Sequence, residues 1–371
     1  YPHLELMGSV IFQMAGLAAA DVRIIQLRVN GQNLADSDYS HTYGSYSAIE
    51  VLDSDWAKNH FPDDDAGNIY RCSYYEDGSH PRTLADLDYK ESAGQTPNPD
   101  DYRNNYIKKT NEAQDDWSDL FTLIDKLNND NITDDQFVAE IGQVVNLEKW
   151  MRFLAVDALL GNREGGLTSG SGDDYAMYRG VKDPRFWLVG HDLDTLLGQG
   201  DHNYRPQWDI FTYTGVDGLK RLLRHPDVIR LYYSQYKDLA ETVFAQENIF
   251  PLIDRLLGNW VPNSEIEGQR GIKQFVIDRK NSILYGGYPD SGDEPQIPQK
   301  FAINNNLPVV NGFGRITIPV INLDGTANAI ETRSVLVNGQ LVDESDFSQK
   351  NGTWSIRGVF LNPGINRIIV Q

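Results

Sequence analysis

The chain has 371 residues, of which 40% are hydrophobic and 11% aromatic, a composition that supports a sizeable core in two domains and argues against disorder. Its 53 acidic and 33 basic residues give a net charge of −20, which opposes binding to nucleic acid or to an anionic membrane. No apolar run is long enough for a transmembrane helix, and the single cysteine, Cys72, excludes an internal disulfide framework and a cysteine-based zinc site.

The first part of the chain predicts a helix followed by hairpin strands. Apolar residues recur at helical spacing over 3–16. Residues 21–29 are rich in β-branched side chains and end in Asn30-Gly31, a strong signal for a hairpin turn, with 46–52 as the returning strand. A short strand is expected at 68–72. This order is typical of an α+β fold rather than of alternating βαβ units.

An acidic tip, Asp63-Asp64-Asp65, precedes that short strand. A calcium-binding loop would use such carboxylates. A solvated turn explains the same residues and is the favoured interpretation, because Asp and Gly are common in turns. Beyond the strand, residues 79–106 are polar and contain three prolines, which indicates a long irregular connection.

Helices dominate the middle of the chain, and we expect them at 115–128, 133–145 and 147–160. Thr133 and Asn146 are suitable caps for the second and third of these helices, and Gly161 is well placed to end the third. Asn162 and Glu164 would then lie just after the C-terminal end of that helix. Asp157, inside the helix, either supports this site or is an exposed or capping acid.

Two carboxylates, Asp192 and Asp194, follow the second of two strands expected at 175–179 and 186–191. Because they are two residues apart, they would share one face of an extended segment. Such a pair can hold a hard cation such as Mg²⁺, which takes oxygen ligands. A polar strand end that leads into a turn is the alternative.

The last third of the chain changes from helical to period-two patterning. Helices are expected at 226–244, 247–257 and 264–285, and strands at 315–321, 334–337, 353–359 and 366–370, with Asn338-Gly339 as a hairpin turn. The predicted domains are therefore 1–286, a Pro- and Gly-rich linker at 287–299, and a small all-β region at 300–371. We interpret the last as an immunoglobulin-like β-sandwich that is incomplete at its C-terminal end.

The order of several short motifs resembles the CotH kinase family of spore-coat and secreted atypical kinases. Gly161-Asn162-Arg163-Glu164-Gly165 is similar to its G-N-x-D-G loop. The similarity continues in Asp173-Asp174-Tyr175 with Tyr178, and in His191-Asp192-Leu193-Asp194 with Gly198. Upstream elements at 27–31, 44–50 and 67–70 resemble its V-N-G, G-x-Y-x-x-x-E and G-N-L-Y-K motifs. Together these motifs cover roughly residues 3–285.

The resemblance implies an atypical protein-kinase-like fold for 1–286. Because the family's opening strands precede the first helix, we expect the N-terminal part to be truncated and Tyr1 to be a processed or fragment start. The resemblance further implies ATP with Mg²⁺ or Mn²⁺ as cofactors. It makes Asp192 the first metal ligand, Asp194 a second ligand or its support, and Asp174 a third, in a place where the family has Asn.

For the other site residues, the resemblance implies roles around the acceptor and the nucleotide. Glu164 would accept the proton of the acceptor hydroxyl, although the family has the shorter Asp there, and Asn162 would orient the loop or add a ligand. Arg71 and Glu50 would contact the nucleotide. Arg71 stands where the family has Lys, which keeps the charge but changes its shape.

Three functions follow from these observations. The leading hypothesis is a secreted or cell-surface kinase that transfers the γ-phosphate of ATP to Ser or Thr of a protein substrate. The second is a catalytically inactive surface or assembly protein with the same fold, favoured by Glu164, Arg71 and the missing opening strands. The third is a calcium-dependent adhesion or carbohydrate-binding protein, supported by the acidic tip and the many Tyr and Trp residues.

Overall fold

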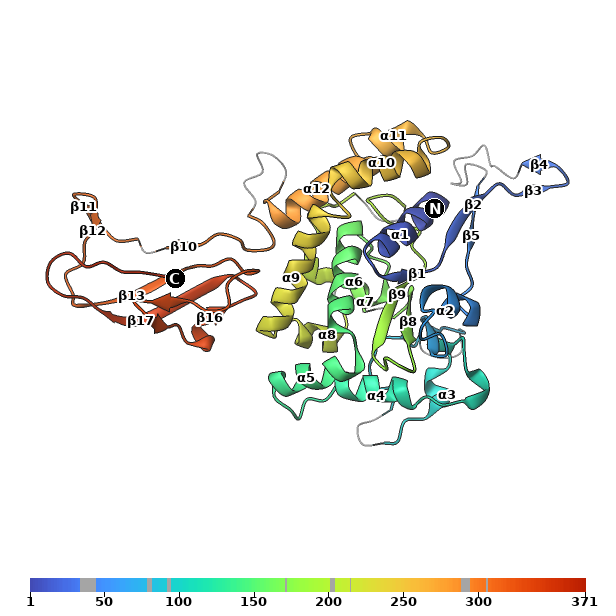
Figure 1. Ribbon diagram of the computed structural model, residues 1–371, viewed down its shortest axis with the longest axis horizontal. Helices are drawn as coiled ribbons and strands as arrows, with labels where there is room; N and C mark the ends of the chain where they lie inside the picture. Colours follow the sequence, from blue (N-terminus) through green and yellow to red (C-terminus); the bar gives the residue numbers. More distant parts are fainter. Residues whose placement is uncertain are drawn as a thin grey trace.

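The computed structural model describes residues 1–33, 45–78, 82–91, 95–170, 172–200, 204–213, 215–287, 294–304 and 306–371. Over these residues, helices and a five-stranded sheet form the larger part of the chain, and a smaller strand-rich region follows (Figure 1). The fold is therefore α+β, as the sequence predicts. Among the described helices, none combines the length and the apolar character that crossing a bilayer requires.

The central sheet has the strand order β1-β9-β8-β6-β7, in which β1 and β9 are parallel and the other neighbours antiparallel. The bounds are β1 Ala18–Ala19, β6 Asn68–Cys72, β7 Tyr106–Lys108, β8 Tyr175–Arg179 and β9 Phe186–Gly190. Alternate residues of β8 face opposite sides. Tyr175 and Met177 enter a large helical core, whereas Ala176 and Tyr178 pack in a smaller core with Trp56. Both faces of β8 are covered, which explains its apolar run.

The helices that make up the large core surround α6, whose residues are mostly buried and which packs against α9 (Figure 1). The described α-helices, of which α2 packs in the smaller core, are α1 Pro2–Met14, α2 Ser54–His60, α3 Pro99–Tyr102, α4 Ser118–Leu127, α5 Asp134–Val144, α6 Leu147–Leu160, α7 Gly166–Ser169, α8 Asp217–Leu222, α9 Pro226–Glu241, α10 Gln246–Leu257, α11 Asn263–Glu267 and α12 Ile272–Leu284. Three short 3₁₀ turns lie at Glu112–Gln114, Ile210–Tyr213 and Glu344–Asp346.

The predicted helix caps are confirmed. Thr133 forms a reciprocal capping box with Gln136 at the start of α5. Asn146 accepts a hydrogen bond from the backbone of Lys149 at the start of α6. Gly161 ends α6 in the left-handed conformation, with φ 69°. The start of α6 and its exit are therefore set by local sequence.

Two predictions for the chain outside the central sheet need correction. The connection expected to be irregular at 79–106 contains α3, although residues 79–81 and 92–94 of it lie outside the described residues. The single helix expected at 264–285 is divided into α11 and α12. Gly268 and Gly271 lie between them, where the helical backbone cost of glycine favours a break.

The hairpin expected after the first helix is confirmed in part. β2 Val22–Ile25 pairs with β5 Tyr46–Ile49, as the returning-strand prediction requires. Asn30-Gly31 closes a smaller hairpin between β3 Arg28–Val29 and β4 Gln32–Asn33, with φ 51° and 77° at the two turn residues. Gly44, quoted for the G-x-Y motif, lies outside the described residues.

The C-terminal region holds a four-stranded sheet in the order β10-β13-β17-β16 and two short hairpins. The strands are β10 Ala302–Ile303, β11 Val309–Val310, β12 Phe313–Gly314, β13 Val320–Thr326, β14 Leu336–Val337, β15 Gln340–Leu341, β16 Phe347–Ser348 and β17 Thr353–Phe360. The turn at Asn338-Gly339 and the strand at 353–359 are confirmed. Trp354 lies in a separate small core with Ile321 and Val337.

Two strand predictions in this region are wrong. The strand expected at 315–321 begins only at Val320, directly after Pro319, which has no N–H to offer a ladder. Residues 366–370 form a single bridge, between Val370 and Val337. Asn366 instead donates from its side chain to the carbonyls of Asn362 and Gly364, a local turn that competes with strand pairing. The predicted linker includes residues 288–293, which lie outside the described residues.

Candidate active site

The two predicted metal ligands lie in a turn beyond the end of β9. That strand ends at Gly190, and Asp192 has φ 54°, in the left-handed region that side chains other than Gly, Asn and Asp seldom adopt. The expectation that Asp192 and Asp194 share one face of an extended segment is therefore wrong. Burial raises the pKa of Asp192, and the nearby charges of Asp194 and Glu164 raise it further.

The exit of α6 brings the predicted catalytic loop to this turn. At Gly161 a Cβ atom would lie 2.7 Å from the ring of Phe275, so both the positive φ and the close packing require glycine. Asn162 is buried; its Nδ2 donates to Asp157 Oδ1 (3.1 Å), and its Oδ1 accepts from the backbone of Gly165 (3.2 Å). These bonds identify Asn162 as a positioning residue for the loop.

Glu164 reaches from that loop to the residue after Asp194. Thr195 Oγ1 donates to Glu164 Oε2 at 2.5 Å. Thr195 is buried and was not predicted from the sequence; a hydroxyl directly after D-L-D was the available signal. The bond joins the loop after α6 to the turn after β9, so that both carboxylate-bearing segments hold each other in place.

Asp174 completes a group of four carboxylates. It directly precedes β8 and, like Asp192, has a left-handed backbone, with φ 53°. Burial raises the pKa of Asp174 to about 8, and the charges of Asp173, Asp192, Glu164 and Asp194 add to this effect. The structure therefore places Asp174, Asp192, Asp194 and Glu164 within electrostatic reach of one another. We call these four residues the carboxylate group.

The donor set of the carboxylate group suits a hard divalent cation. It offers oxygen atoms alone, the ligand type that Mg²⁺ and Mn²⁺ prefer. The amino group of Tyr1 lies 3.0 Å from Asp194 Oδ2, and both this amino group and Arg71 lower the pKa of Asp192. Burial and like charge nevertheless hold the pKa of Asp174 and of Asp192 above the usual range. Among the described residues, the ligand atoms of these four acids do not converge within the 4.8 Å spacing found at Asp21, Glu50 and His60. A bound cation would add to the neutralisation that the Tyr1 amino group and Arg71 provide.

Glu5 supports the turn from α1 and was missed in the sequence. It is buried, and its Oε2 accepts a hydrogen bond of 2.6 Å from the backbone nitrogen of Leu193, the residue between Asp192 and Asp194. Burial raises the pKa of Glu5 to about 7, the hydrogen bond from Leu193 lowers it, and the charges of Asp192 and Asp194 raise it. A carboxylate within the apolar face of a helix was the signal that could have identified it.

Arg71 and Glu50, the two residues predicted to contact the nucleotide, have different surroundings. Arg71 on β6 donates from Nε to His191 Nε2 (2.9 Å), and its charge lowers the pKa of Asp192. Arg71 is therefore close to the carboxylate group. Glu50 accepts instead from the side chain of Asn59 and the backbone of Asp21, and its Oε2 lies 2.8 Å from His60 Nε2.

The surroundings of Glu50 are a separate cluster. Ligand atoms of Asp21, Glu50 and His60 lie within 4.8 Å of one another, a spacing that a metal ion could use. The hydrogen bonds from Asn59 and from the Asp21 backbone, with the contact to His60, already satisfy the Glu50 carboxylate, and together they lower its pKa despite partial burial. They fasten the end of β5 to α2.

Asp64 of the acidic tip binds the backbone of the turn between β8 and β9. Asp64 accepts hydrogen bonds of 2.8 to 2.9 Å from the backbone nitrogens of Val181, Lys182 and Asp183. Its pKa is lowered by these three bonds, which outweigh a desolvation effect in the opposite direction. The geometry gives this carboxylate a structural partner in the chain itself.

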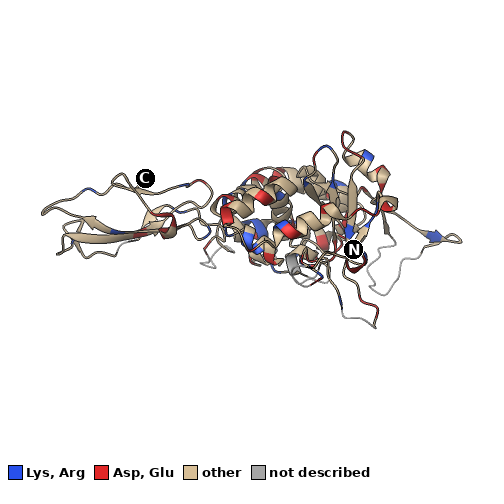
Figure 2. Ribbon diagram, turned by 90° about the horizontal axis from the view of Figure 1, so that it is seen from below, with Lys and Arg blue, Asp and Glu red and all other residues tan. Residues whose placement is uncertain are grey.

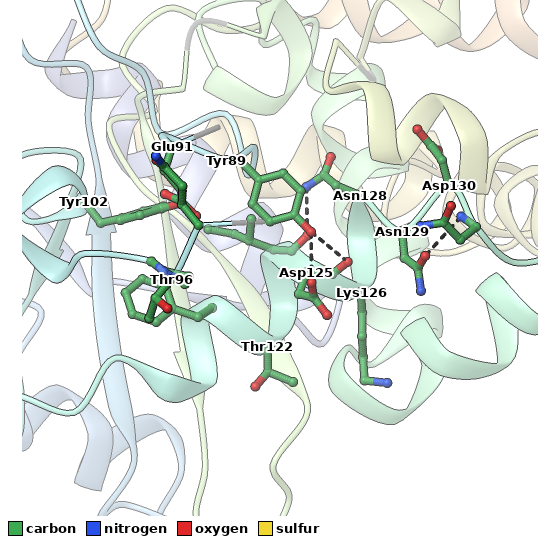
Figure 3. Close-up of a pocket in the computed structure, with 15 residues that line it drawn as sticks. Tyr89, Glu91, Thr96, Tyr102, Thr122, Asp125, Lys126, Asn128, Asn129 and Asp130 are labelled. Atoms are coloured by element: carbon green, nitrogen blue, oxygen red, sulfur yellow. Dashed lines mark hydrogen bonds between the residues drawn. The ribbon is translucent and has the colours of Figure 1, made fainter. Parts of the chain in front are cut away.

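A cavity of about 760 Å³ lies apart from the predicted site, beside α4 (Figure 3). Its walls include Tyr89, Asp125 and Asn128, and the Tyr89 hydroxyl donates to Asp125 Oδ1 at 3.0 Å. Its lining contains no member of the carboxylate group. The predicted metal ligands and Glu164 therefore lie outside this cavity.

Comparison with known proteins identifies one family. The sequence profile described as CotH kinase protein matches residues 5–277, well over half of the chain. The match includes Glu5 and most of α1, all four members of the carboxylate group, and the first part of α12. A search of curated proteins finds no match.

Proposed function

Because the chain belongs to the CotH kinase protein family, we propose that it transfers the γ-phosphate of ATP to Ser or Thr of a protein substrate, with Mg²⁺ or Mn²⁺. The observation that carries this proposal is the carboxylate group, which gathers four acids from three segments. Phosphoryl transfer depends on positioning and on charge neutralisation, and a divalent cation supplies the latter when bound. We propose a secreted or cell-surface location on the resemblance alone.

The proposed roles follow from position. Asp192 and Asp194 are the first cation ligands, and Asp174 faces them from the start of β8. Glu164 accepts the proton of the acceptor hydroxyl, which replaces the Thr195 hydroxyl as its hydrogen-bond donor. Arg71, beside Asp192, orients the phosphates. Glu50 acts at a distance, by fixing β5 to α2.

Calorimetric titration of ATP with Mn²⁺ tests this function. We expect Asp192→Ala to weaken ATP binding about tenfold or more, since it removes a charged ligand, and to lower phosphate transfer at least about 100-fold. Asp217→Ala removes the same charge from an exposed position at the start of α8 and should bind like the unchanged chain. Equal ATP binding by the Asp192 and Asp217 variants, with both folded, would contradict the proposal.

A catalytically inactive assembly protein is the second candidate. The observation that favours it is the 2.5 Å bond between Thr195 and Glu164, which occupies the proposed base. Thr195→Val separates the two functions. In a kinase the freed Glu164 keeps or gains activity, whereas an inactive protein shows no transfer with either side chain and binds no ATP.

A further inference from the structure

Two arginines and a tryptophan form a cluster that starts at the residue before the proposed base. The guanidinium carbon of Arg163, the residue before Glu164, is 4.2 Å from the ring centroid of Trp208. The guanidinium carbon of Arg205 is 5.8 Å from the same centroid. We call Arg163, Arg205 and Trp208 the arginine–tryptophan cluster. All three residues lie within the described part of the chain.

The cations of the cluster are oriented but not neutralised. Arg152 and Arg221, elsewhere in the molecule, each have a carboxylate within 3.0 Å. Within the described part of the chain, no carboxylate forms such an ion pair with Arg163 or Arg205. Stacking on an aromatic ring holds the guanidinium plane in place and leaves its N–H donors available. The cluster therefore presents positive charge in a chain whose net charge is −20.

A buried arginine fixes the position of the cluster. Arg279 of α12 donates from Nε to the carbonyl of Ala158 in the last turn of α6 (2.7 Å). Its Nη1 donates to the carbonyl of Pro206 (2.9 Å) and to that of Trp208. One side chain, 1% exposed, thus joins the helix that leads to Arg163 to the loop that carries Trp208. These bonds hold the loop that carries Trp208 against the C-terminal end of α6.

The cluster is within reach of a bound acceptor. Consecutive Cα atoms are about 3.8 Å apart, so Arg163 starts within one residue of the proposed base. An extended peptide advances about 3.3 Å per residue. When the acceptor hydroxyl lies at Glu164, side chains one to three residues away can therefore approach the arginines.

The arrangement of N–H donors in a guanidinium group determines which class of peptide side chain the cluster can bind. A guanidinium group binds carboxylates and phosphates through two parallel hydrogen bonds. A nucleotide base is a poorer occupant, because Arg163 already lies over the ring of Trp208. We propose, on the basis of the function above, that the cluster recognises a carboxylate or phosphate one to three residues from the acceptor Ser or Thr. The carboxylate group repels acidic side chains elsewhere in the site, so the preference should be confined to those positions.

Peptide kinetics test this proposal with the full chain, ATP and Mn²⁺. Each peptide has one Ser in a neutral background and carries Glu, phosphoserine, Ala or Lys at one of the three positions on either side. We expect Glu or phosphoserine at one nearby position to lower the KM for peptide about tenfold relative to Ala, the effect of one charged hydrogen bond. Comparing the KM values of the Glu and phosphoserine peptides shows whether the cluster prefers a carboxylate or a phosphate.

The variant Arg163→Ala/Arg205→Ala should abolish this preference and leave the KM for ATP unchanged. Arg230→Ala, which removes an ion-paired arginine from α9, is the matched control and should keep the preference. Retention of the acidic preference in the double variant would overturn the proposal. So would a rise in the KM for ATP alone, because the cluster would then contact nucleotide phosphates.

A binding measurement separates this proposal from the proposed function. Fluorescence anisotropy of the labelled Glu and Lys peptides is recorded with the chain and with the double variant, without ATP. Tighter binding of the Glu peptide that is lost in the double variant supports the cluster even if no peptide is phosphorylated, an outcome in which only the kinase function fails. Phosphorylation without any acidic preference overturns the cluster and leaves the kinase function standing. Equal binding of both peptides overturns the recognition proposal.

Discussion

Two aspartates with left-handed backbone mark the candidate site at the scale of single residues. Asp174 and Asp192 each lie at one end of an apolar strand, with φ near +50°. Such conformations cost energy for most residues and persist where the surrounding structure fixes them. Here they turn the chain at neighbouring ends of β8 and β9, which are paired. The sequence indicated the carboxylates but not the turn, because D-x-D is compatible with strand and turn alike.

Asp157 gives a pH-dependent prediction at this scale. Its carboxyl group is 2% exposed, and burial raises its pKa from 3.8 to about 7. Between these values the folded chain holds a proton that the unfolded chain has released. The free energy of unfolding should therefore fall as pH rises through this range, by up to about 1.4 kcal/mol per pH unit. The contribution is fully present below pH 3.8 and is lost above about 7.

Asp157→Asn should remove this loss, because the amide oxygen can still accept from Asn162 and carries no charge. Urea unfolding at about pH 5 and about pH 8 measures it. We expect the variant to be more stable than the unchanged chain at the higher pH, by about 1 to 4 kcal/mol. Equal pH slopes for the two proteins would show that Asp157 is ionised in the folded chain.

At the scale of elements, α1 supports the turn after β9. The contact between Glu5 and Leu193 joins residues 188 positions apart. We expect Glu5→Ala to weaken Mn²⁺ binding in the absence of ATP about tenfold, since the turn between Asp192 and Asp194 loses its buried hydrogen bond. Glu5→Gln keeps an acceptor and should restore most of the affinity. Mn²⁺ titration followed by electron paramagnetic resonance measures both.

The Glu5 variants separate positioning from charge. Gln13→Ala is the matched control, since it removes side-chain bonds to Ala19 and Asp21 from the same helix without affecting Leu193. If Glu5→Gln binds Mn²⁺ as weakly as Glu5→Ala, the negative charge of Glu5 matters and its hydrogen bond does not.

The helices, strands and turns also differ in how well the sequence predicted them. Caps such as Thr133 and the turn at Asn338-Gly339 were predictable because they depend on a few adjacent residues. Asp192 and Asp174 were recognisable from motif order. Glu5 and the cluster around Trp208 were not, because their roles arise from contacts between segments far apart in the chain. The strand expected at 366–370 failed because Asn366 bonds locally instead of pairing.

At the scale of the whole molecule, the negative charge belongs to one part of the chain. Residues 1–299 contain 48 of the 53 acids and 27 of the 33 bases, a net charge of −21, whereas 300–371 has five acids and six bases. Acidic and basic residues both cover the helical part, and the C-terminal sheet region is mostly uncharged (Figure 2). The two parts meet at α9, where Tyr233 donates to the carbonyl of Lys350 and Lys237 pairs with Glu331.

This charge distribution predicts how salt affects stability. Two effects compete, because added salt screens the mutual repulsion of the acidic part and also weakens exposed ion pairs such as Lys58–Asp55. Exposed pairs contribute little individually, so we expect the reduced repulsion to dominate. The free energy of unfolding by urea should rise by about 1 kcal/mol between about 20 mM and about 200 mM NaCl at neutral pH.

Two controls identify the cause of that rise. Near the sequence isoelectric point of about 4.7 the repulsion vanishes, and the salt effect should vanish with it. Asp192→Ala removes a proposed cation ligand but only one of many charges, so it should retain most of the rise. A rise that disappears in this variant would come from Na⁺ held by the carboxylate group. A stability that falls with salt at neutral pH would show that ion pairs outweigh the net charge of the acidic part.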